Sequence, residues 1–401
     1  MLVFSAARLL TPSDHIEQPL LLVEAGRVLD ICSRSAHSVP PAVSVCDFGD
    51  AFIAPGFIDL HIHGSAGYDV MDETADALPA IEKMLAHHGV SSYLPTTVTA
   101  PLDATLRALE RLADAIESRG EQREKVGGPR CEEPMNVDRS RAQPLGIHIE
   151  GPFISHARSG VHPLQDLLPP SLGLFEQLWQ AARGHIRMIT IAPELEQAPE
   201  VIAEAARRGV CVSLGHSDAD FATTERAIAS GARHATHTFN AMRPLDHRNP
   251  GILGAVLTDH RLTADIIADG VHLHPSIVKL FAKAKGPEQT VLITDAISAT
   301  GMPNGRYHLG AFEVDVLDGT CSLNGRLAGS VLSMDRAVRN LADFAGWSLA
   351  QALSAASRNP ARVAGFVDRG VLVPGAYADF VVLNSQGEVL RTFIGGIECS
   401  A

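Results

Sequence analysis

The sequence predicts an α/β fold, a (β/α)8 barrel of the TIM type with a small β-sandwich domain that is built from both termini. Two observations support this fold class. Short apolar runs alternate with helical patterns over residues 55–365, and repeated strand–helix units of this kind form parallel sheets. Residues 1–54 and 366–401 instead contain short apolar segments broken by Pro, Gly and Asp, as small sheets do.

The two ends of the chain resemble each other in pattern. Near the amino end, "QPLLLVEAGRVLDI" (18–31) and "SVCDFGDAFIAPG" (44–56) are apolar segments interrupted by turn residues. Near the carboxyl end, "DRGVLVPGAYADFVVLNSQGEVLRTFIGG" (368–396) has the same character. We therefore expect residues 1–54 and 366–401 to pair into one small β domain beside a catalytic barrel formed by residues 55–365.

The barrel segment consists of apolar runs followed by helical patterns. In "TLRALERLADAIESRG" (105–120), the leucines recur at helical spacing and Gly120 is a helix stop signal. The next segment, 120–144, is polar and without period, which predicts a surface loop. The remaining strand–helix pairs are 144–153 with 171–184, 186–194 with 200–209, 210–217 with 219–231 and 261–272 with 275–286, and the strand 290–301 precedes a long loop.

Composition excludes several function classes. The chain has 401 residues and a net charge of −13, which disfavours nucleic acid as the main partner because phosphate backbones require basic surfaces. No apolar run has the length of about 18 residues that a membrane span needs, and no signal peptide is evident. The six cysteines are scattered without a C-x-x-C motif, which favours a cytoplasmic chain with unpaired thiols.

Imidazole and carboxylate side chains recur at the predicted ends of successive strands. His61 and His63 in "APGFIDLHIHG" are two residues apart, so a strand presents both on one face. Catalytic groups of a barrel lie where strands end and the following loops begin. The complete set at these positions is His61, His63, His148, Glu150, His216, His237, Asp269, His272 and Asp295.

These residue types match a hydrolytic metal centre. Such a centre needs about three protein ligands, an open position for water and a carboxylate that exchanges a proton with that water. A single histidine is more often structural, but a set at successive strand ends favours a site. His148 lies two residues before Glu150 and could share its face of the strand. It could contact a metal ligand from behind, or it could simply pack in the core.

The motifs, taken in order, resemble the amidohydrolase superfamily and, within it, the N-acetylglucosamine-6-phosphate deacetylase family. "APGFIDLHIHG" carries the superfamily signature. "HIEGPF", "HTFNAM" and "IADGVH" together are specific to the deacetylases, and further matching segments extend over nearly the whole chain. The resemblance implies a barrel of the amidohydrolase type and a hydrolase that acts on a linear amide.

The resemblance also implies roles for individual residues. Glu150, His216 and His237 resemble the ligands of the main metal ion, and Asp295 resembles the general base and acid. His162 in "SGVHP" resembles the histidine that polarises the acetamide carbonyl. The residues that resemble those gripping the sugar and its phosphate are His272, Asn240, Ala241 and Arg248, and in the family this arginine crosses a homodimer interface.

Members of the family differ at the HxH pair, and this chain retains both His61 and His63. Two expectations are therefore compatible with the sequence. Either Glu150 bridges a second ion, or the second position is weak or empty. The expected cofactor is a divalent ion, Zn²⁺ first, with Fe²⁺, Mn²⁺ or Co²⁺ as alternatives. The mechanistic hypothesis is attack of metal-activated water on the N-acetyl carbonyl, with Asp295 as base and then acid.

The sequence allows two alternative interpretations. One is a deacetylase of a related acetamido sugar phosphate, such as N-acetylgalactosamine-6-phosphate, because a single inverted hydroxyl is read by contacts that the motifs do not reveal. The other, from a different class, is a non-catalytic binding protein on the same fold. Lost ligands or a lost base would mark such a protein, and Glu150, His216, His237 and Asp295 are all present.

Overall fold

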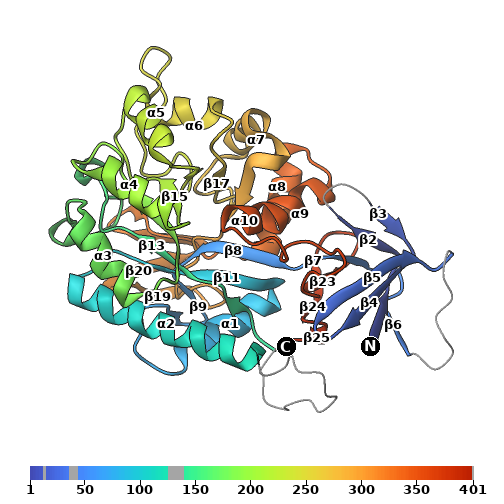
Figure 1. The fold of residues 1–401 in the computed structure, drawn as a ribbon. Coiled ribbons are helices and arrows are strands. Elements are labelled where there is room, and N and C mark those ends of the chain that lie inside the picture. Colours follow the sequence, from blue (N-terminus) through green and yellow to red (C-terminus); the bar gives the residue numbers. More distant parts are fainter. Residues whose placement is uncertain (12–14, 36–43, 125–139, 400–401) are drawn as a thin grey trace.

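A computed structural model describes residues 1–11, 15–35, 44–124 and 140–399. Its larger part is a curled parallel sheet surrounded by helices, and a smaller all-β region lies to one side (Figure 1). The first and last strands of the described chain, β1 (Leu2–Ser5) and β25 (Ile397–Glu398), both lie in the all-β region (Figure 1). Among the helices of the described residues, none combines the length and the apolar character that crossing a bilayer requires.

The parallel strands follow one another around the sheet nearly in chain order. β8 pairs with β11, and the sheet continues through β13, β14, β15 and β16, with β17 and β18 as a further parallel pair. Their side chains are mostly buried and apolar, as in a sheet covered on both faces. The bounds are β8 (Phe57–Ile62), β11 (Val90–Thr97), β12 (Gln143–Pro144), β13 (Ile147–Glu150), β14 (Ile186–Ile191), β15 (Cys211–Leu214), β16 (His234–Ala235), β17 (Ala264–Ile266) and β18 (Thr290–Leu292).

Backbone hydrogen bonds bridge the two gaps in this sheet. The amide of Ala235 donates to the carbonyl oxygen of Thr263 over 3.1 Å, which joins β16 to β17. The amide of Asp295 donates to the carbonyl oxygen of His61 over 2.9 Å, which joins the segment after β18 to β8. The parallel sheet therefore curls back onto its first strand, which is consistent with the predicted TIM-like barrel.

Helices cover the outside of the sheet with their apolar faces inward. In α2, the buried side chains include Leu109 and Leu112, as the leucine spacing predicts. The prediction of a loop from residue 120 was wrong at its start, because α2 continues through Gly120 to Glu124. Glycine disfavours a helix, but the Glu, Gln, Arg and Glu that follow it have good helix propensity. Residues 140–144 include β12, and the rest of the predicted loop, 125–139, falls outside the described residues. The helices are α1 (Ala77–His87), α2 (Leu102–Glu124), α3 (Leu172–Ala181), α4 (Ala198–Arg207), α5 (Phe221–Ser230), α6 (Gly251–Thr258), α7 (Pro275–Gln289), α8 (Met334–Ala345), α9 (Leu349–Ala356) and α10 (Arg358–Val363), with 3-10 turns η1 (His156–Arg158) and η2 (Leu164–Asp166).

Strands from both chain ends share one sheet in the all-β region. β7, which directly precedes β8, pairs antiparallel with β23 near the carboxyl end, and Ala54 lies opposite Val381. An apolar cluster that includes Phe4, Phe380 and Phe393 packs between strands of this sheet and of a four-stranded neighbour. The two sheets have the orders β5-β4-β1-β6 and β25-β24-β23-β7-β2-β3, with bounds β1 (Leu2–Ser5), β2 (Arg8–Leu10), β3 (His15–Glu17), β4 (Pro19–Glu24), β5 (Arg27–Ser33), β6 (Val45–Asp47), β7 (Phe52–Pro55), β23 (Phe380–Leu383), β24 (Val389–Ile394) and β25 (Ile397–Glu398).

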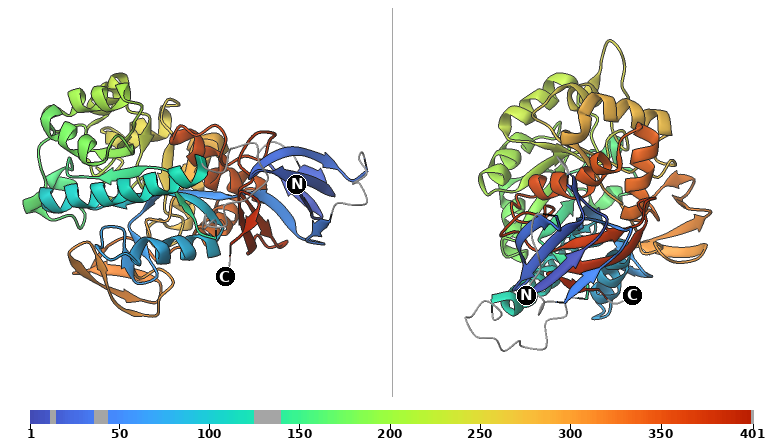
Figure 2. Two further views of the ribbon diagram at one scale, coloured as in Figure 1. Left: turned by 60° about the horizontal axis from the view of Figure 1, so that its bottom comes forward. Right: turned by 90° about the vertical axis from the view of Figure 1, so that its right-hand side faces the viewer.

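The predicted long loop after residue 301 is wrong, because a four-stranded antiparallel sheet occupies this segment (orange in Figure 2). Asp318-Gly319 and Asn324-Gly325 connect its strands, and all four residues have positive φ, from 49° to 81°. Asp-Gly and Asn-Gly favour such tight hairpin turns. The strands are β19 (Gly305–Leu309), β20 (Phe312–Leu317), β21 (Thr320–Leu323) and β22 (Arg326–Leu327), and a small hairpin, β9 (Gly64–Ser65) with β10 (Tyr68–Asp69), follows β8.

Candidate active site

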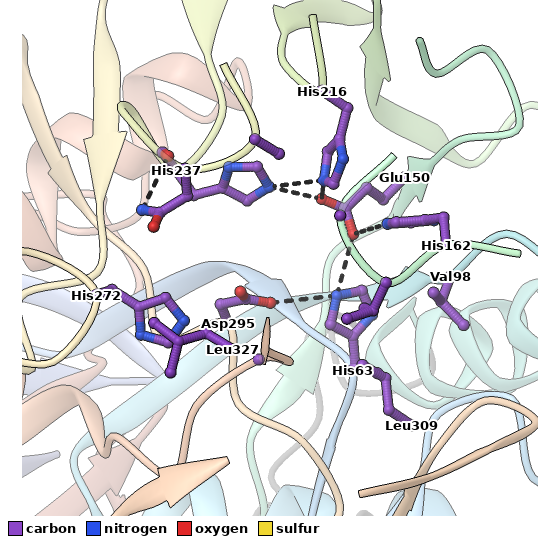
Figure 3. Close-up of a pocket in the computed structure, with 15 residues that line it drawn as sticks. His63, Val98, Glu150, His162, His216, His237, His272, Asp295, Leu309 and Leu327 are labelled. Atoms are coloured by element: carbon purple, nitrogen blue, oxygen red, sulfur yellow. Dashed lines mark hydrogen bonds and ion pairs between the residues drawn. The ribbon is translucent and has the colours of Figure 1, made fainter. Parts of the chain in front are cut away.

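A cavity of about 200 Å³ lies at the carboxyl ends of the parallel strands. Its polar wall comes from loops that follow different strands, and its side chains converge on one point (Figure 3). Residues that are far apart in the sequence thus lie together at the carboxyl-end edge of the sheet, where barrels have their active sites. The polar residues that line it are His63, Glu150, His162, His216, His237, Asn240, His272 and Asp295.

Three of these residues have an unusual backbone conformation. His216, His237 and Asp295 have φ values of 47°, 27° and 49°, and each lies just beyond the end of a strand. Positive φ is unfavourable for residues other than glycine, and such strain concentrates at functional sites. This backbone conformation turns the chain sharply after each strand, and the side chain then points into the cavity.

One carboxylate oxygen of Glu150 faces His216 and His237. Oε1 lies 3.3 Å from Nε2 of His216 and 3.0 Å from Nε2 of His237. The two Nε2 atoms are themselves 3.0 Å apart. Glu150 is 3% exposed, so this triangle of potential ligand atoms is held in a largely dry environment.

The second carboxylate oxygen faces the HxH pair. Oε2 of Glu150 lies 3.2 Å from Nε2 of His63 and 3.4 Å from Nε2 of His61. Oδ1 of Asp295 completes this group at 3.3 Å from His63 and 3.6 Å from His61. Glu150 therefore stands between two groups of potential ligands and offers one oxygen to each, the arrangement in which a carboxylate can bridge two cations.

Hydrogen bonds on the far side of two imidazoles fix their tautomers. Nδ1 of His63 donates to the carbonyl oxygen of Thr96, and Nδ1 of His216 donates to that of Arg158, each over 3.0 Å. In neutral imidazoles the Nε2 atoms then carry lone pairs, as metal ligands require. Lone pairs that face one another across about 3 Å need a cation between them, so the donor set fits a divalent ion.

His162 has the opposite tautomer. Its Nδ1 faces the backbone N–H of Thr99 at 3.3 Å and the hydroxyl of the same residue at 2.8 Å. The N–H can only donate and the hydroxyl can donate too, an arrangement that favours the proton of the neutral ring on Nε2. His162 Nε2 lies 3.5 Å from Oε2 of Glu150. Glu150, His162 and His216 are close enough to form a ligand group, all within 4.8 Å. The tautomer nevertheless makes His162 a hydrogen-bond donor and favours His237 as the third ligand.

The electrostatics favour two ionised carboxylates. Burial would raise the pKa of Glu150, but the charge of His61 and hydrogen bonds from the other imidazoles hold it well below its usual range. Burial also opposes ionisation of Asp295, yet the hydrogen bond with His63 and the charges of both HxH imidazoles lower its pKa to about 2. Two negative side chains therefore lie among five imidazoles, which is an environment that attracts cations.

The facing imidazoles differ in proton affinity. Burial lowers the pKa of His216 to about 4. Burial acts on His237 in the same direction, but its hydrogen bond and attraction to Glu150 raise its pKa to about 9. Adjacent imidazoles cannot both hold a proton readily, and a bound cation takes the place of that single proton.

Most of the other predicted site residues also line the cavity. Nδ1 of His272 lies 2.7 Å from Oδ2 of Asp269, and His272, Asn240 and Ala241 line the cavity. Arg248 does not line the cavity of its own chain and lies on an exposed loop. His148 is fully buried with polar contacts to the carbonyl oxygen of Leu60 and to Thr190, so it does not reach the cavity.

Sequence reasoning missed the apolar wall of the cavity. Val98 follows β11, Leu309 ends β19 and Leu327 ends β22, and all three line the same space as the polar groups. Two of them come from the antiparallel sheet that was expected to be a loop. The alternating pattern of "FEVDVL" (312–317), followed by Asp-Gly, was the signal that could have revealed a hairpin there.

Relatives among characterised proteins match over nearly the whole chain. N-acetylgalactosamine-6-phosphate deacetylase of Escherichia coli O157:H7 is 38% identical over 397 residues, which cover 98% of each chain. N-acetylglucosamine-6-phosphate deacetylase of Bos taurus is 39% identical over 390 residues, which cover 94% of this chain and 90% of the relative.

Solved structures agree with these relatives. A variant of N-acetyl-D-glucosamine-6-phosphate deacetylase from Mycobacterium smegmatis, in complex with N-acetyl-D-glucosamine-6-phosphate, matches 100% of this chain and 99% of its own at 33% identity and a TM-score of 0.87. N-acetylglucosamine-6-phosphate deacetylase from Thermotoga maritima matches 98% of both chains at 31% identity and a TM-score of 0.84. The model of the amidohydrolase family matches residues 52–398. The resemblance noted in the sequence is confirmed, and the chain belongs to the amidohydrolase family.

Proposed function

We propose that this protein hydrolyses the acetamide of N-acetylglucosamine-6-phosphate to glucosamine-6-phosphate and acetate. The carboxylate of Glu150, shared between two imidazole groups with Asp295 beside one of them, is the observation that carries this proposal. Relatives at 38–39% identity over nearly their full length are deacetylases of amino sugar phosphates. The site and the relatives together support a metal-dependent hydrolase rather than a binding protein.

A divalent ion is the proposed cofactor, with Zn²⁺ preferred because imidazole and carboxylate are its usual ligands. Glu150, His216 and His237 would hold the main ion, and His61 and His63 would hold a second ion together with Glu150. Such an ion acts as a Lewis acid on the carbonyl and lowers the pKa of bound water.

The chain's own residues supply proton transfer and orientation. Asp295 is ionised and lies at the edge of the cavity, so it takes a proton from the attacking water and returns one to the leaving amine. His162 carries its proton on Nε2 and donates to the acyl oxygen as negative charge develops there. Acetate and the free amine are then released.

The sugar would lie against the side of the cavity formed by His272, Asn240 and Ala241. The phosphate requires a cation, and arginine binds phosphate through two parallel hydrogen bonds. Arg248 is exposed and lies outside the cavity of its own chain. This placement supports a homodimer in which Arg248 of one copy reaches the active site of the other.

A second candidate substrate is N-acetylgalactosamine-6-phosphate, favoured by the 38% identical relative that carries that name. The decisive experiment measures acetate release by metal-replete protein from N-acetylglucosamine-6-phosphate, its galactosamine epimer and unphosphorylated N-acetylglucosamine. Fast turnover of the first compound, with large losses on inverting the hydroxyl or removing the phosphate, is the expected result. If the protein prefers the galactosamine epimer, that epimer is the substrate. If it hydrolyses none of the three compounds, the proposal is overturned.

Domain organisation and location follow as further parts of the proposal. Residues 1–54 and 366–401 would form a sandwich-like β domain, supported by the apolar cluster between their sheets. Residues 55–365 would form the catalytic barrel. Cys32, Cys46, Cys211 and Cys321 carry free thiols, which supports a reducing cytoplasmic location.

A further inference from the structure

The cavity has an apolar wall that takes no part in the chemistry described above. Val98 and Leu309 line the cavity, yet they are only 3% and 2% exposed. Because so little of these two side chains is accessible from the cavity, only a small group of a bound substrate can contact them. Leu327 also lines the cavity but is 39% exposed, so it belongs to the more open part.

Val98 packs against the backbone of Gly310, the residue that follows Leu309. A methyl group added to Gly310 would lie 2.7 Å from Cγ1 of Val98, so the backbone next to Leu309 packs directly against Val98. The amide of Gly310 donates to Oδ2 of the buried Asp69 over 2.8 Å, which anchors this turn to the loop after β8. Val98 and Leu309 thus line neighbouring parts of the cavity wall, which we call the apolar corner.

This corner lies beside the residue that we assign to the acyl oxygen. Thr99, next to Val98 in the chain, donates its amide proton to His162. Figure 3 shows Val98 and Leu309 on the side of His162 and His63, whereas Leu327 lies toward Asp295 and His272. The apolar corner and His272 thus occupy different sides of the cavity.

The carbonyl carbon of an amide has three substituents in one plane. Its oxygen must face His162 and the cation site, and its nitrogen must face Asp295, which protonates the leaving amine. The remaining substituent, the acyl chain, then points away from Asp295 and His272. We infer that Val98 and Leu309 form the acyl pocket and restrict the substrate to an acetyl group; this inference rests on the proposed function.

The test compares acyl chain lengths on one sugar phosphate. We would measure kcat/KM of the metal-replete protein for N-acetyl-, N-propionyl- and N-butyryl-glucosamine-6-phosphate. Val98→Ala and Leu309→Ala should raise the propionyl-to-acetyl ratio about tenfold or more, the discrimination that one methylene group can provide in an apolar pocket. Leu327→Ala is the matched control, because it also removes a cavity-lining leucine, and its ratio should stay that of the unaltered protein.

A change in the opposite direction guards against variants that do not fold. Val98→Ile shrinks the corner by one methylene group and should shift the preference from acetyl toward N-formyl-glucosamine-6-phosphate. Ratios that stay constant in all Val98 and Leu309 variants, or that shift equally in Leu327→Ala, would overturn the acyl pocket while the deacetylase remained active. Failure of the unaltered protein to hydrolyse any of these amides would instead overturn the proposed function.

Discussion

The backbone amide of Thr99 donates to Nδ1 of His162 over 3.3 Å, and this contact places the imidazole proton on Nε2, inside the cavity. A main-chain N–H can only donate, and the Thr99 hydroxyl, 2.8 Å from the same nitrogen, can donate to it as well. His63 and His216 have their Nδ1 atoms bound to carbonyl oxygens instead. The hydrogen-bond partner of Nδ1 thus distinguishes a candidate donor, His162, from the candidate ligands His63 and His216.

His162→Asn should retain metal and lose activity. Removing one preorganised donor to a developing oxyanion costs about 10²- to 10³-fold in kcat. His216→Ala, in contrast, should lose bound metal because it removes a proposed ligand. Metal content by elemental analysis, together with kcat, separates the two roles. Loss of metal from His162→Asn equal to that from His216→Ala would show that His162 is a ligand.

The HxH pair should hold its own ion. The double variant His61→Ala/His63→Ala removes two imidazoles from one side of Glu150 and leaves His216 and His237 in place. We expect about one ion fewer per chain than in the unaltered protein. His87→Ala, which removes an exposed imidazole from α1, is the control. An unchanged metal content in the double variant would indicate that the chain binds a single ion without the pair.

Asp295→Asn should abolish proton transfer without disturbing the shape of the cavity. The pKa of Asp295, which the hydrogen bond and charge of His63 hold at about 2 against the effect of burial, keeps this carboxylate ionised and able to act as a base at neutral pH. The amide side chain cannot accept the proton, so we expect kcat to fall about 10²- to 10⁴-fold. The KM and the metal content serve as controls, and near-normal turnover would exclude Asp295 as the base.

Arg248→Ala should weaken binding of the phosphorylated sugar selectively. Loss of a charged hydrogen-bond partner costs about 1.5–3 kcal/mol, which corresponds to an increase of about 10- to 100-fold in KM. The KM for unphosphorylated N-acetylglucosamine should stay unchanged. Arg226→Ala removes another exposed arginine and provides the comparison. Equal effects on both sugars would mean that Arg248 does not contact the phosphate.

Stability in acid should depend on Asp335, away from the cavity. Burial opposes its ionisation, but the hydrogen bonds from His88 and Ser333 and the charge of Arg339 lower its pKa from 3.8 to about 2. A carboxyl whose pKa is lower in the folded state stabilises the fold above about pH 4 and loses this contribution as the pH falls toward 2. The size of the shift corresponds to about 2 kcal/mol.

Asp335→Asn should therefore unfold more easily than the unaltered protein at pH 6, and the difference should shrink as the pH falls from 4 to 2. Denaturant unfolding at several pH values measures both free energies of unfolding. Asp343→Asn, on the same helix α8, is a suitable control because no comparable partners hold its carboxylate in the described structure. A difference in stability that is constant over this pH range would contradict the assignment.

The sequence could predict the parallel barrel and the candidate ligands because both depend on local pattern. Strands and helices alternate visibly from β8 onward, and the carboxyl ends of parallel strands must meet at one edge. His61, His63, Glu150, His216 and Asp295 could therefore be assembled into one site from their strand-end positions alone. The sheet formed by residues 305–327 was not predicted, because its strands are short and pair only with one another; Asp-Gly and Asn-Gly are the turn signals that indicate it.

The sequence alone thus indicated the candidate ligands and the edge of the sheet at which their side chains lie close together. Only the tertiary structure decided how the two oxygens of Glu150 divide between the imidazole groups, which nitrogen of His162 carries the proton, and that Val98 packs against Gly310. Each of these depends on contacts between residues far apart in the chain or on backbone conformations such as the positive φ of His237. The helix and strand propensities of single residues cannot predict such contacts, because the contacts form only when the strands pack together.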